Sequence, residues 1–251
     1  PGSSIKPIST YAPAIDQGLI TPYSVVTDMP VFNNSGTAWP RNENRRYDGQ
    51  TTIMQGVADS TNTVAVQVLK MLTPQSAYNF LTEKLGFTTL ENADIDYAPM
   101  ALGGLTDGAT VREMAQAYTA LANYGNYSEA ISYTTVVDAN GETILSNEDN
   151  TPTQVFEHPE STPYYINDLL TNAVENGTGK LAKINGIDVA GKTGTTTANQ
   201  DRWFAGYTPY YVGVTWFGYD ERYGLPSLSP NAAVAVWTEV MDRLHEDKED
   251  K

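Results

Sequence analysis

Apolar residues recur every three or four positions in several stretches of the chain, a spacing that predicts amphipathic helices. The clearest stretch follows Thr110-Val-Arg-Glu113, which has the spacing of a capping box, and its helix is expected to end at Gly125. Threonine–proline and serine–proline pairs mark other starts, because proline is tolerated in a first helical turn. Further helices are expected at residues 63–71, 73–86, 162–177 and 229–244.

Strand signals lie mostly in the second half of the chain. Residues 134–145 alternate around Asn140-Gly141, which predicts a β-hairpin with a two-residue turn. Further strands are expected at residues 187–195, 202–207 and 211–217. The polar segment 28–50 is expected to be an ordered loop, and the charged run 245–251 a solvated, frayed tail. Helices first, then an antiparallel sheet and a final covering helix, predict an α+β fold.

The composition narrows the chemistry that the chain can perform. Of 251 residues, 15 are Lys or Arg and 30 are Asp or Glu, so the net charge is −15. Such an acidic chain repels phosphate, and no nucleic-acid partner is expected. Cysteine is absent and the two histidines are far apart, so no metal site, disulfide or histidine-based triad is expected. Catalysis would have to use Ser, Thr, Lys, Asp, Glu or Tyr.

The first candidate for chemistry is the segment Pro1-Gly-Ser-Ser-Ile-Lys-Pro7. If a helix begins at Ser3, then Ser3 and Lys6 face the same way. A serine hydroxyl becomes a good nucleophile when a base takes its proton, and an amine kept neutral by burial can be that base. The same spacing is also common on plain helix surfaces. Further along this helix, Pro13 predicts a kink or an early end near Ala12.

Two later motifs have a structural and a functional interpretation. Ser60-Thr-Asn62 precedes the expected buried helix, where it could cap that helix, or relay a proton and hold a peptide bond. Lys192-Thr-Gly-Thr195 lies on an expected strand, where it could be an exposed edge, or a cation with two hydroxyls that binds a carboxylate. Gly194 would let a ligand backbone lie close to that strand.

Residues Gly186 to Thr193 also fit the phosphate-loop pattern G-x4-G-K-[ST]. That loop must lead from a strand into a helix. Here the middle residues are strand-like, and the run from Gly194 through three threonines is a poor helix start. The strand is therefore expected to continue through Gly194, which argues against a nucleotide site.

In this order, S-x-x-K, S-x-N and K-T-G resemble the three motifs of the serine penicillin-binding proteins and β-lactamases. The surrounding sequence is similar to the transpeptidase domain of class A, bifunctional penicillin-binding proteins. The resemblance extends over nearly the whole chain. It is carried by Pro1–Pro7, Tyr47–Gly49, Ala58–Asn62, Ala101–Thr106, Glu113–Tyr118, Gly177–Gly179, Ala190–Thr196, Asp201–Tyr207 and Gly218–Asp220.

This resemblance implies a penicillin-binding protein/β-lactamase-like fold over residues 1–244, with an antiparallel sheet flanked by helices and a mainly helical subdomain. It implies D,D-transpeptidation of peptidoglycan stem peptides, with no cofactor. Ser3 would be the nucleophile that attacks the penultimate D-Ala carbonyl, and Lys6 would be its base. β-Lactams, which resemble the D-Ala-D-Ala end, would acylate Ser3 and be released very slowly.

The resemblance also assigns roles in the second and third motifs. Ser60 and Lys192 would pass a proton toward the leaving nitrogen, and Asn62 would hold the substrate amide and orient Lys6. The backbone N–H groups of Ser3 and Thr195 would form an oxyanion hole. The terminal carboxylate of the substrate would be bound by Lys192, Thr193, Gly194 and Thr195.

The start of the chain departs from the family pattern. The family's sheet normally draws two strands from sequence upstream of the nucleophile, whereas two residues precede Ser3 and the first is not Met. We also expect this chain to lack the membrane anchor and the glycosyltransferase domain that class A members carry. We therefore expect a trimmed or cleaved fragment, with a separate chain as one source of the missing strands. The parent protein is expected at the extracytoplasmic face of the bacterial cytoplasmic membrane.

Two further interpretations keep the serine chemistry and change its purpose. In a D,D-carboxypeptidase or β-lactamase, water would take the acyl group, but no Glu has a sequence context that fits the deacylating residue of a class A β-lactamase. In a β-lactam-sensing domain, the acylated serine would serve as a signal. The lifetime of a penicillin adduct would separate the first of these from a transpeptidase.

Overall fold

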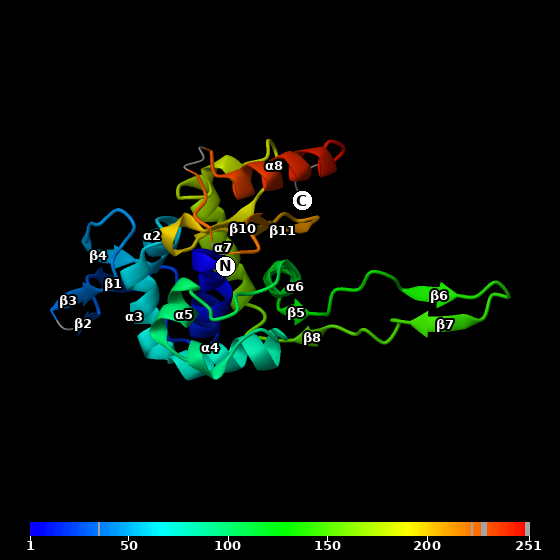
Figure 1. Ribbon diagram of the computed structural model, residues 1–251, viewed down its shortest axis with the longest axis horizontal. Helices are drawn as coiled ribbons and strands as arrows, with labels where there is room; N and C mark the ends of the chain where they lie inside the picture. Colours follow the sequence, from blue (N-terminus) through cyan, green and yellow to red (C-terminus); the bar gives the residue numbers. More distant parts are fainter. Residues whose placement is uncertain (35, 222, 227–229, 249–251) are drawn as a thin grey trace.

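The computed structural model describes residues 1–34, 36–221, 223–226 and 230–248. Its first residues form a helical segment that runs through the middle of the molecule (Figure 1). The segment begins as a 3₁₀ turn, η1 (Gly2–Ile5), continues as a π-helix, η2 (Pro7–Tyr11), and ends as α1 (Ala12–Asp16). The sequence predicts a kink or an early end near Ala12, and the early end is wrong because the helical segment continues to Asp16. The winding changes at Ala12, so that Pro13 falls in a new first turn, where a missing N–H is tolerated.

Most helices begin where their caps predict. The first turn of α6 shows both hydrogen bonds of the capping box between Thr110 and Glu113. The helix expected at 73–86 is confirmed but divides into α4 and the π-helix η3, and the final helix begins at Ala232, capped by Asn231. The expected start at Ser229 lies outside the described residues. The helices are α2 (Ile53–Ala58), α3 (Asn62–Leu72), α4 (Pro74–Asn79), η3 (Phe80–Lys84), η4 (Asn92–Asp94), α5 (Tyr97–Leu102), α6 (Val111–Ala122), α7 (Thr162–Glu175), η5 (Lys180–Ala182), η6 (Thr197–Asn199) and α8 (Ala232–Leu244).

The main sheet is antiparallel and has the strand order β11-β10-β9. Its strands are β9 (Ala190–Thr195), β10 (Asp201–Tyr207) and β11 (Val212–Gly218), which confirms all three predicted strands, although β9 begins three residues later than expected. The register sets Arg202 opposite Thr195 and Ala205 opposite Lys192. Among the described residues, no strand pairs with the outer edge of β11.

The sheet separates two hydrophobic clusters, and this arrangement confirms the α+β class. On one face, Trp237 of α8 packs edge-on against Phe204, with ring centroids 4.9 Å apart. On the other face, Trp203, Ala205 and Tyr207 join a larger core shared with the helices of the first half of the chain. Alternation along β10 therefore buries both faces of the sheet.

The prediction of a loop over residues 28–50 is partly wrong. This segment contains the hairpin of β2 (Phe32–Asn34) with β3 (Thr37–Trp39), and β1 (Val25–Asp28) pairs with β4 (Gly49–Thr52) around it. The rings of Phe32 and Trp39 lie 6.0 Å apart across the hairpin. Strands of three or four residues are too short for alternation to show in the sequence, and here a cross-strand aromatic pair stabilises them.

The hairpin expected at 134–145 is confirmed as β6 (Thr135–Val137) with β7 (Thr143–Ser146). It lies on an arm whose base is β5 (Asn126–Tyr127) with β8 (Thr153–Gln154), and the arm extends far from the body (Figure 1). The expected two-residue turn is wrong. A type I′ turn needs positive φ at two central residues, but Gly141 alone has it (85°), and the chain reverses over Asp138 to Gly141.

The expected tail begins one residue later than the sequence indicates. His245 is 4 % exposed, its Nε2 lies 2.8 Å from the Thr208 hydroxyl, and its ring packs against Tyr210 and Tyr211. The sequence shows only the charges around this residue, whereas α8 carries it onto the turn between β10 and β11. Residues 246–248 are exposed, and the rest of the predicted tail lies outside the described residues.

Candidate active site

The first helical turn crosses the end of β9 at very short range. Gly2 N–H donates to the Gly103 carbonyl (3.2 Å), and a Cβ at Gly2 would lie 2.5 Å from the Thr195 carbonyl oxygen. Glycine is thus required for the segment to fit between β9 and the end of α5. Of residues 1–16, all of which the structure describes, Ser3 alone is not buried. The crossing therefore presents one hydroxyl to solvent beside Thr195.

Lys6 lies one turn after Ser3 and is fully buried. Its Nζ donates to the Ser60 carbonyl (2.9 Å) and to Asn62 Oδ1 (2.8 Å). Burial lowers the pKa of Lys6 well below its usual value, and the nearby charge of Lys192 lowers it further. The lowered pKa favours the neutral amine more than it would for a lysine in water.

Ser60 lies in the turn that joins α2 to α3. Its backbone is left-handed (φ 59°), an uncommon conformation for a residue with a side chain. The helix cap is Thr61 rather than Ser60. The Ser60 hydroxyl instead accepts a hydrogen bond from Lys192 Nζ (2.9 Å), so Ser60 contacts one lysine through its carbonyl and the other through its side chain.

Lys192 reaches this turn from β9 and is 1 % exposed. Burial lowers the pKa of Lys192 to about 7. Hydrogen bonds thus connect Lys6, Asn62, Ser60 and Lys192, which belong to three segments far apart in the sequence. The strand continues through Gly194 and no α-helix follows it directly, which confirms that this is not a phosphate loop.

The second half of β9 carries two threonine hydroxyls, and each has a hydrogen-bond partner. Thr193 Oγ1 lies 3.0 Å from Thr178 Oγ1, and Arg202 Nη1 donates to Thr195 Oγ1 (2.8 Å). Thr178 and Arg202 lie in segments that carry the family resemblance, but the sequence alone assigned them no role in the site. The pairing of the two predicted strands could have indicated Arg202, because the register sets it opposite Thr195.

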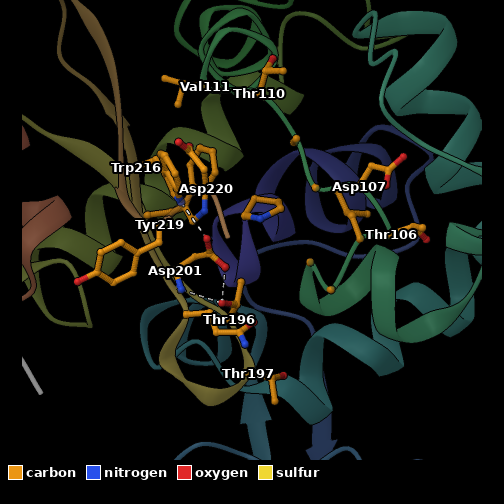
Figure 2. Close-up of a pocket in the computed structure, with 18 of the residues that line it drawn as sticks. Thr106, Asp107, Thr110, Val111, Thr196, Thr197, Asp201, Trp216, Tyr219 and Asp220 are labelled. Carbon is orange, nitrogen blue, oxygen red and sulfur yellow. Dashed lines mark hydrogen bonds between the residues drawn. The ribbon is translucent and has the colours of Figure 1, made fainter. Parts of the chain in front are cut away.

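A pocket of about 680 Å³ opens beside this cluster, lined partly by Pro1 and Thr196, the neighbours of Gly2 and Thr195 (Figure 2). Within it, Asp201 accepts hydrogen bonds from Trp216 Nε1 (2.9 Å) and Thr196 Oγ1 (2.7 Å). The lysine–serine cluster does not line this pocket. In the described part of the chain, no three His, Cys, Asp or Glu side chains gather as a metal site would require.

The solved structures to which this fold is similar include penicillin-binding proteins. The penicillin-binding protein PonA1 from Mycobacterium tuberculosis matches the whole chain with a TM-score of 0.79 at 23% identity, and the chain covers 70% of it. The D,D-transpeptidase domain of a peptidoglycan glycosyltransferase from Eggerthella lenta matches 98% of the chain, with a TM-score of 0.76 at 25% identity and 65% of that structure covered. The fold is therefore that of a penicillin-binding transpeptidase domain.

Sequence comparison gives the family itself. The model of the penicillin binding protein transpeptidase domain matches residues 1–221, and the chain belongs to that family. Penicillin-binding protein 1A of Clostridium perfringens is 34% identical over 98% of the chain, and penicillin-binding protein 4 of Bacillus subtilis is 36% identical over 94%. The chain spans about a third of these curated relatives, 37% of each.

Proposed function

We propose that this domain is a serine D,D-transpeptidase that cross-links peptidoglycan stem peptides. The Ser3 hydroxyl attacks the penultimate D-Ala carbonyl, the peptide bond to the terminal D-Ala breaks, and that residue leaves with a proton on its nitrogen. An amine of a neighbouring stem then attacks the Ser3 ester, forms the cross-link and frees the serine. The observation that carries the proposal is Lys6, a fully buried amine one helical turn from the accessible Ser3.

The contacts of Lys6 suit a base. A neutral amine has two N–H donors and one lone pair. The carbonyl of Ser60 and Oδ1 of Asn62 accept from Nζ, which can engage both donors and leave the lone pair for the Ser3 proton. Burial lowers the pKa of Lys6 and so favours the neutral amine, which is the form that catalysis by a base requires.

Lys192 and Ser60 supply the second proton route and the anion site. The hydrogen bond from Lys192 Nζ to Ser60 Oγ supports transfer of a proton to the leaving nitrogen. Thr193 and Thr195 present hydroxyls to the substrate carboxylate. Gly194 is buried, and a Cβ there would lie 2.1 Å from the Pro1 carbonyl oxygen, so this glycine admits the chain's own first turn and not, as expected from the sequence, a ligand backbone. Backbone N–H groups of Ser3 and Thr195 form the oxyanion hole, and each such donor typically contributes ~3 kcal/mol to transition-state stabilisation.

The parent protein is proposed to act at the outer face of the bacterial cytoplasmic membrane, anchored there and carrying a glycosyltransferase domain. Two observations support this: the chain spans about a third of the relatives, and the Eggerthella lenta structure is named a peptidoglycan glycosyltransferase. In the part of the chain described, we find no helix long and apolar enough to span a bilayer. The open edge of β11 is proposed to receive upstream strands, from the parent or from a separate chain.

A fluorescent penicillin tests the reaction. The wild type is expected to form a covalent adduct on Ser3, located by mass spectrometry of its peptides, and Ser3→Ala is expected to abolish labelling. Thr195→Ala is expected to weaken recognition of the carboxylate while keeping the nucleophile. Ser132→Ala, an exposed serine on the arm, is the matched control and should label like the wild type.

The lifetime of the adduct separates the alternatives. A long-lived ester supports a transpeptidase, because in such an enzyme water hydrolyses the acyl-enzyme only slowly. Release within seconds would instead assign a hydrolase of the carboxypeptidase or β-lactamase kind. An adduct on a residue other than Ser3 would contradict the mechanism altogether.

A further inference from the structure

A buried polar pair outside the motif residues supports the α2–α3 turn. Asn42 lies in the loop between β3 and β4 and is 5 % exposed, and Asp28 lies at the end of β1 and is 3 % exposed. Asn42 Nδ2 donates to Asp28 Oδ1 (2.7 Å) and to the Arg46 carbonyl (2.8 Å). Buried polar groups are costly unless they are paired, and here both donors of the amide have acceptors.

The amide oxygen of Asn42 caps α3 from a distance. It accepts from the backbone N–H groups of Asn62 (3.0 Å) and Thr63 (3.2 Å), which are orphan donors of a helix start. Within the described structure, the local cap Thr61 makes no side-chain capping bond. A loop residue about twenty positions upstream therefore does what a neighbouring Ser, Thr, Asp or Asn usually does.

Asp28 determines which way this amide faces. Its carboxylate takes the Nδ2 donor of Asn42, and it also accepts from the Thr63 hydroxyl and from Asp48 N–H (2.9 Å). With a carboxylate on the nitrogen side, the amide oxygen of Asn42 must face α3. Both side chains thus bind the first turn of α3: Asn42 binds its backbone N–H groups, and Asp28 binds the Thr63 hydroxyl.

The turn held in this way supplies both acceptors of Lys6, namely the Ser60 carbonyl and Asn62 Oδ1. The backbone of Ser60 is left-handed, a strained conformation for a residue with a side chain that persists only when its surroundings hold it. We propose that Asn42, oriented by Asp28, is a positioning residue that fixes the Ser60–Asn62 segment and so aims the Lys6 amine at Ser3. This inference rests on the proposed function.

Without Asn42 the first turn of α3 is free to shift or fray, and Lys6 loses a fixed partner. The amine can then rotate, and its lone pair spends less time directed at the Ser3 hydroxyl. Small misplacements of a catalytic group cost up to about a hundredfold in rate. The site that binds the substrate carboxylate lies on β9 and makes no contact with Asn42, so noncovalent affinity should persist.

Acylation by a chromogenic penicillin, measured with the full chain, tests the proposal. In Asn42→Ala the acylation rate constant at saturation should fall by about ten- to a hundredfold, while the noncovalent dissociation constant stays within about twofold. The ascending limb of the pH profile should move to higher pH, because water admitted at the loosened turn relieves the burial that lowers the pKa of Lys6. Asn44→Ala, an exposed asparagine of the same loop, is the matched control and should behave like the wild type.

Two variants at Asp28 distinguish a loss of positioning from a loss of folded protein. Asp28→Asn keeps the oxygen that accepts from Asn42 and Thr63 and should retain most of the rate, whereas Asp28→Ala should behave like Asn42→Ala. Melting curves give the folded fraction of each variant. Wild-type acylation in folded Asn42→Ala and Asp28→Ala, or losses that follow only the folded fraction, would overturn the inference.

Failure of the proposed function gives a different result, because the wild type itself would then take no penicillin. In that case the titration of Lys6 Nζ, followed by ¹⁵N NMR, still decides the structural part of the inference. A Lys6 pKa higher in Asn42→Ala than in the wild type would support the link from Asn42 to Lys6. An identical pKa would refute it.

Discussion

Two buried lysines are central to the chemistry proposed for this domain. Lysine ordinarily carries its charge in water, and both Lys6 and Lys192 are withdrawn from it almost completely. Their surroundings differ. Lys6 has two oxygen acceptors on one turn, whereas Lys192 donates to the Ser60 hydroxyl and to the Thr193 carbonyl of its own strand. Burial thus lowers the pKa of both amines, as the proposed base Lys6 requires, and leaves Lys192 able to change charge near neutral pH.

The pH dependence of acylation should show this division. The pKa of Lys192 is about 7, so its positive charge is lost above that pH, and the second-order rate constant for penicillin should fall by up to tenfold per pH unit. In Lys192→Arg the charge persists, because a guanidinium does not deprotonate in this range, and the descending limb should disappear. Stopped-flow or gel-based acylation rates from pH 5 to 10 would measure both. A limb that persists unchanged in Lys192→Arg would assign it to another group.

At the scale of elements, buried carboxylates accept hydrogen bonds from backbone N–H groups that lie far away in the sequence. Glu113 of α6 is the clearest case: it accepts from Thr110 in the capping box and also from Thr88 N–H (2.7 Å) in the preceding loop. Burial disfavours the charge of Glu113, but its hydrogen bonds from Thr88 and Thr110 outweigh that and lower the pKa of the carboxyl. One side chain therefore connects a helix start to a loop twenty-five residues upstream.

Glu113→Gln should destabilise the domain by about 2 kcal/mol at pH 7, because part of this buried network is left unpaired. A carboxyl with a lowered pKa stabilises the fold above its unfolded pKa, near 4.5, and this contribution is lost as the pH falls through the folded value. The difference between wild type and variant should therefore shrink in acid. Urea unfolding at pH 7 and pH 3.5 would measure it, with the exposed Glu129→Gln as the control. A difference that stays constant between the two pH values would mean that the charge of Glu113 is not involved.

At the scale of the whole molecule, the arm and the body are separate in stability. No residue of the described segment 128–154 is buried, and Val137, Ile144 and Leu145 are exposed near its tip. Its root is tied to α6, where Arg112 donates to the Ala130 carbonyl (2.7 Å). A two-stranded ribbon without a third layer is only marginally stable in water. The arm therefore contributes little to the core that holds the lysine cluster.

Replacing residues 133–147 by Asn-Gly should leave the body intact. The free energy of unfolding should change by less than ~0.5 kcal/mol, as for other surface changes, and penicillin acylation should stay within twofold of the wild type. Chemical unfolding and acylation rates of the shortened chain would measure the two quantities. A loss of stability above ~1 kcal/mol would show that the arm packs on the body in solution.

Much of the architecture could be predicted because its signals are local. The capping box at Thr110, the three strands of the main sheet and the spacing of Ser3 with Lys6 each depend on neighbours within a few residues. The short hairpin at 32–39 and the burial of His245 could not be predicted, since cross-strand and helix-end contacts decide them. A three-residue strand or a lone histidine carries no periodic signal.

The sequence by itself determined the longer elements, the family and the side chains able to do serine chemistry, because residue type and short spacing encode these properties. The tertiary structure alone decided that Lys6 and Lys192 meet at Ser60, that both are dehydrated, and that Asn42 caps a helix it does not adjoin. Burial and long-range hydrogen bonds depend on the path of the whole chain. The burial that suits Lys6 to the proposed role of base therefore comes from the fold of the whole chain and not from the residue type.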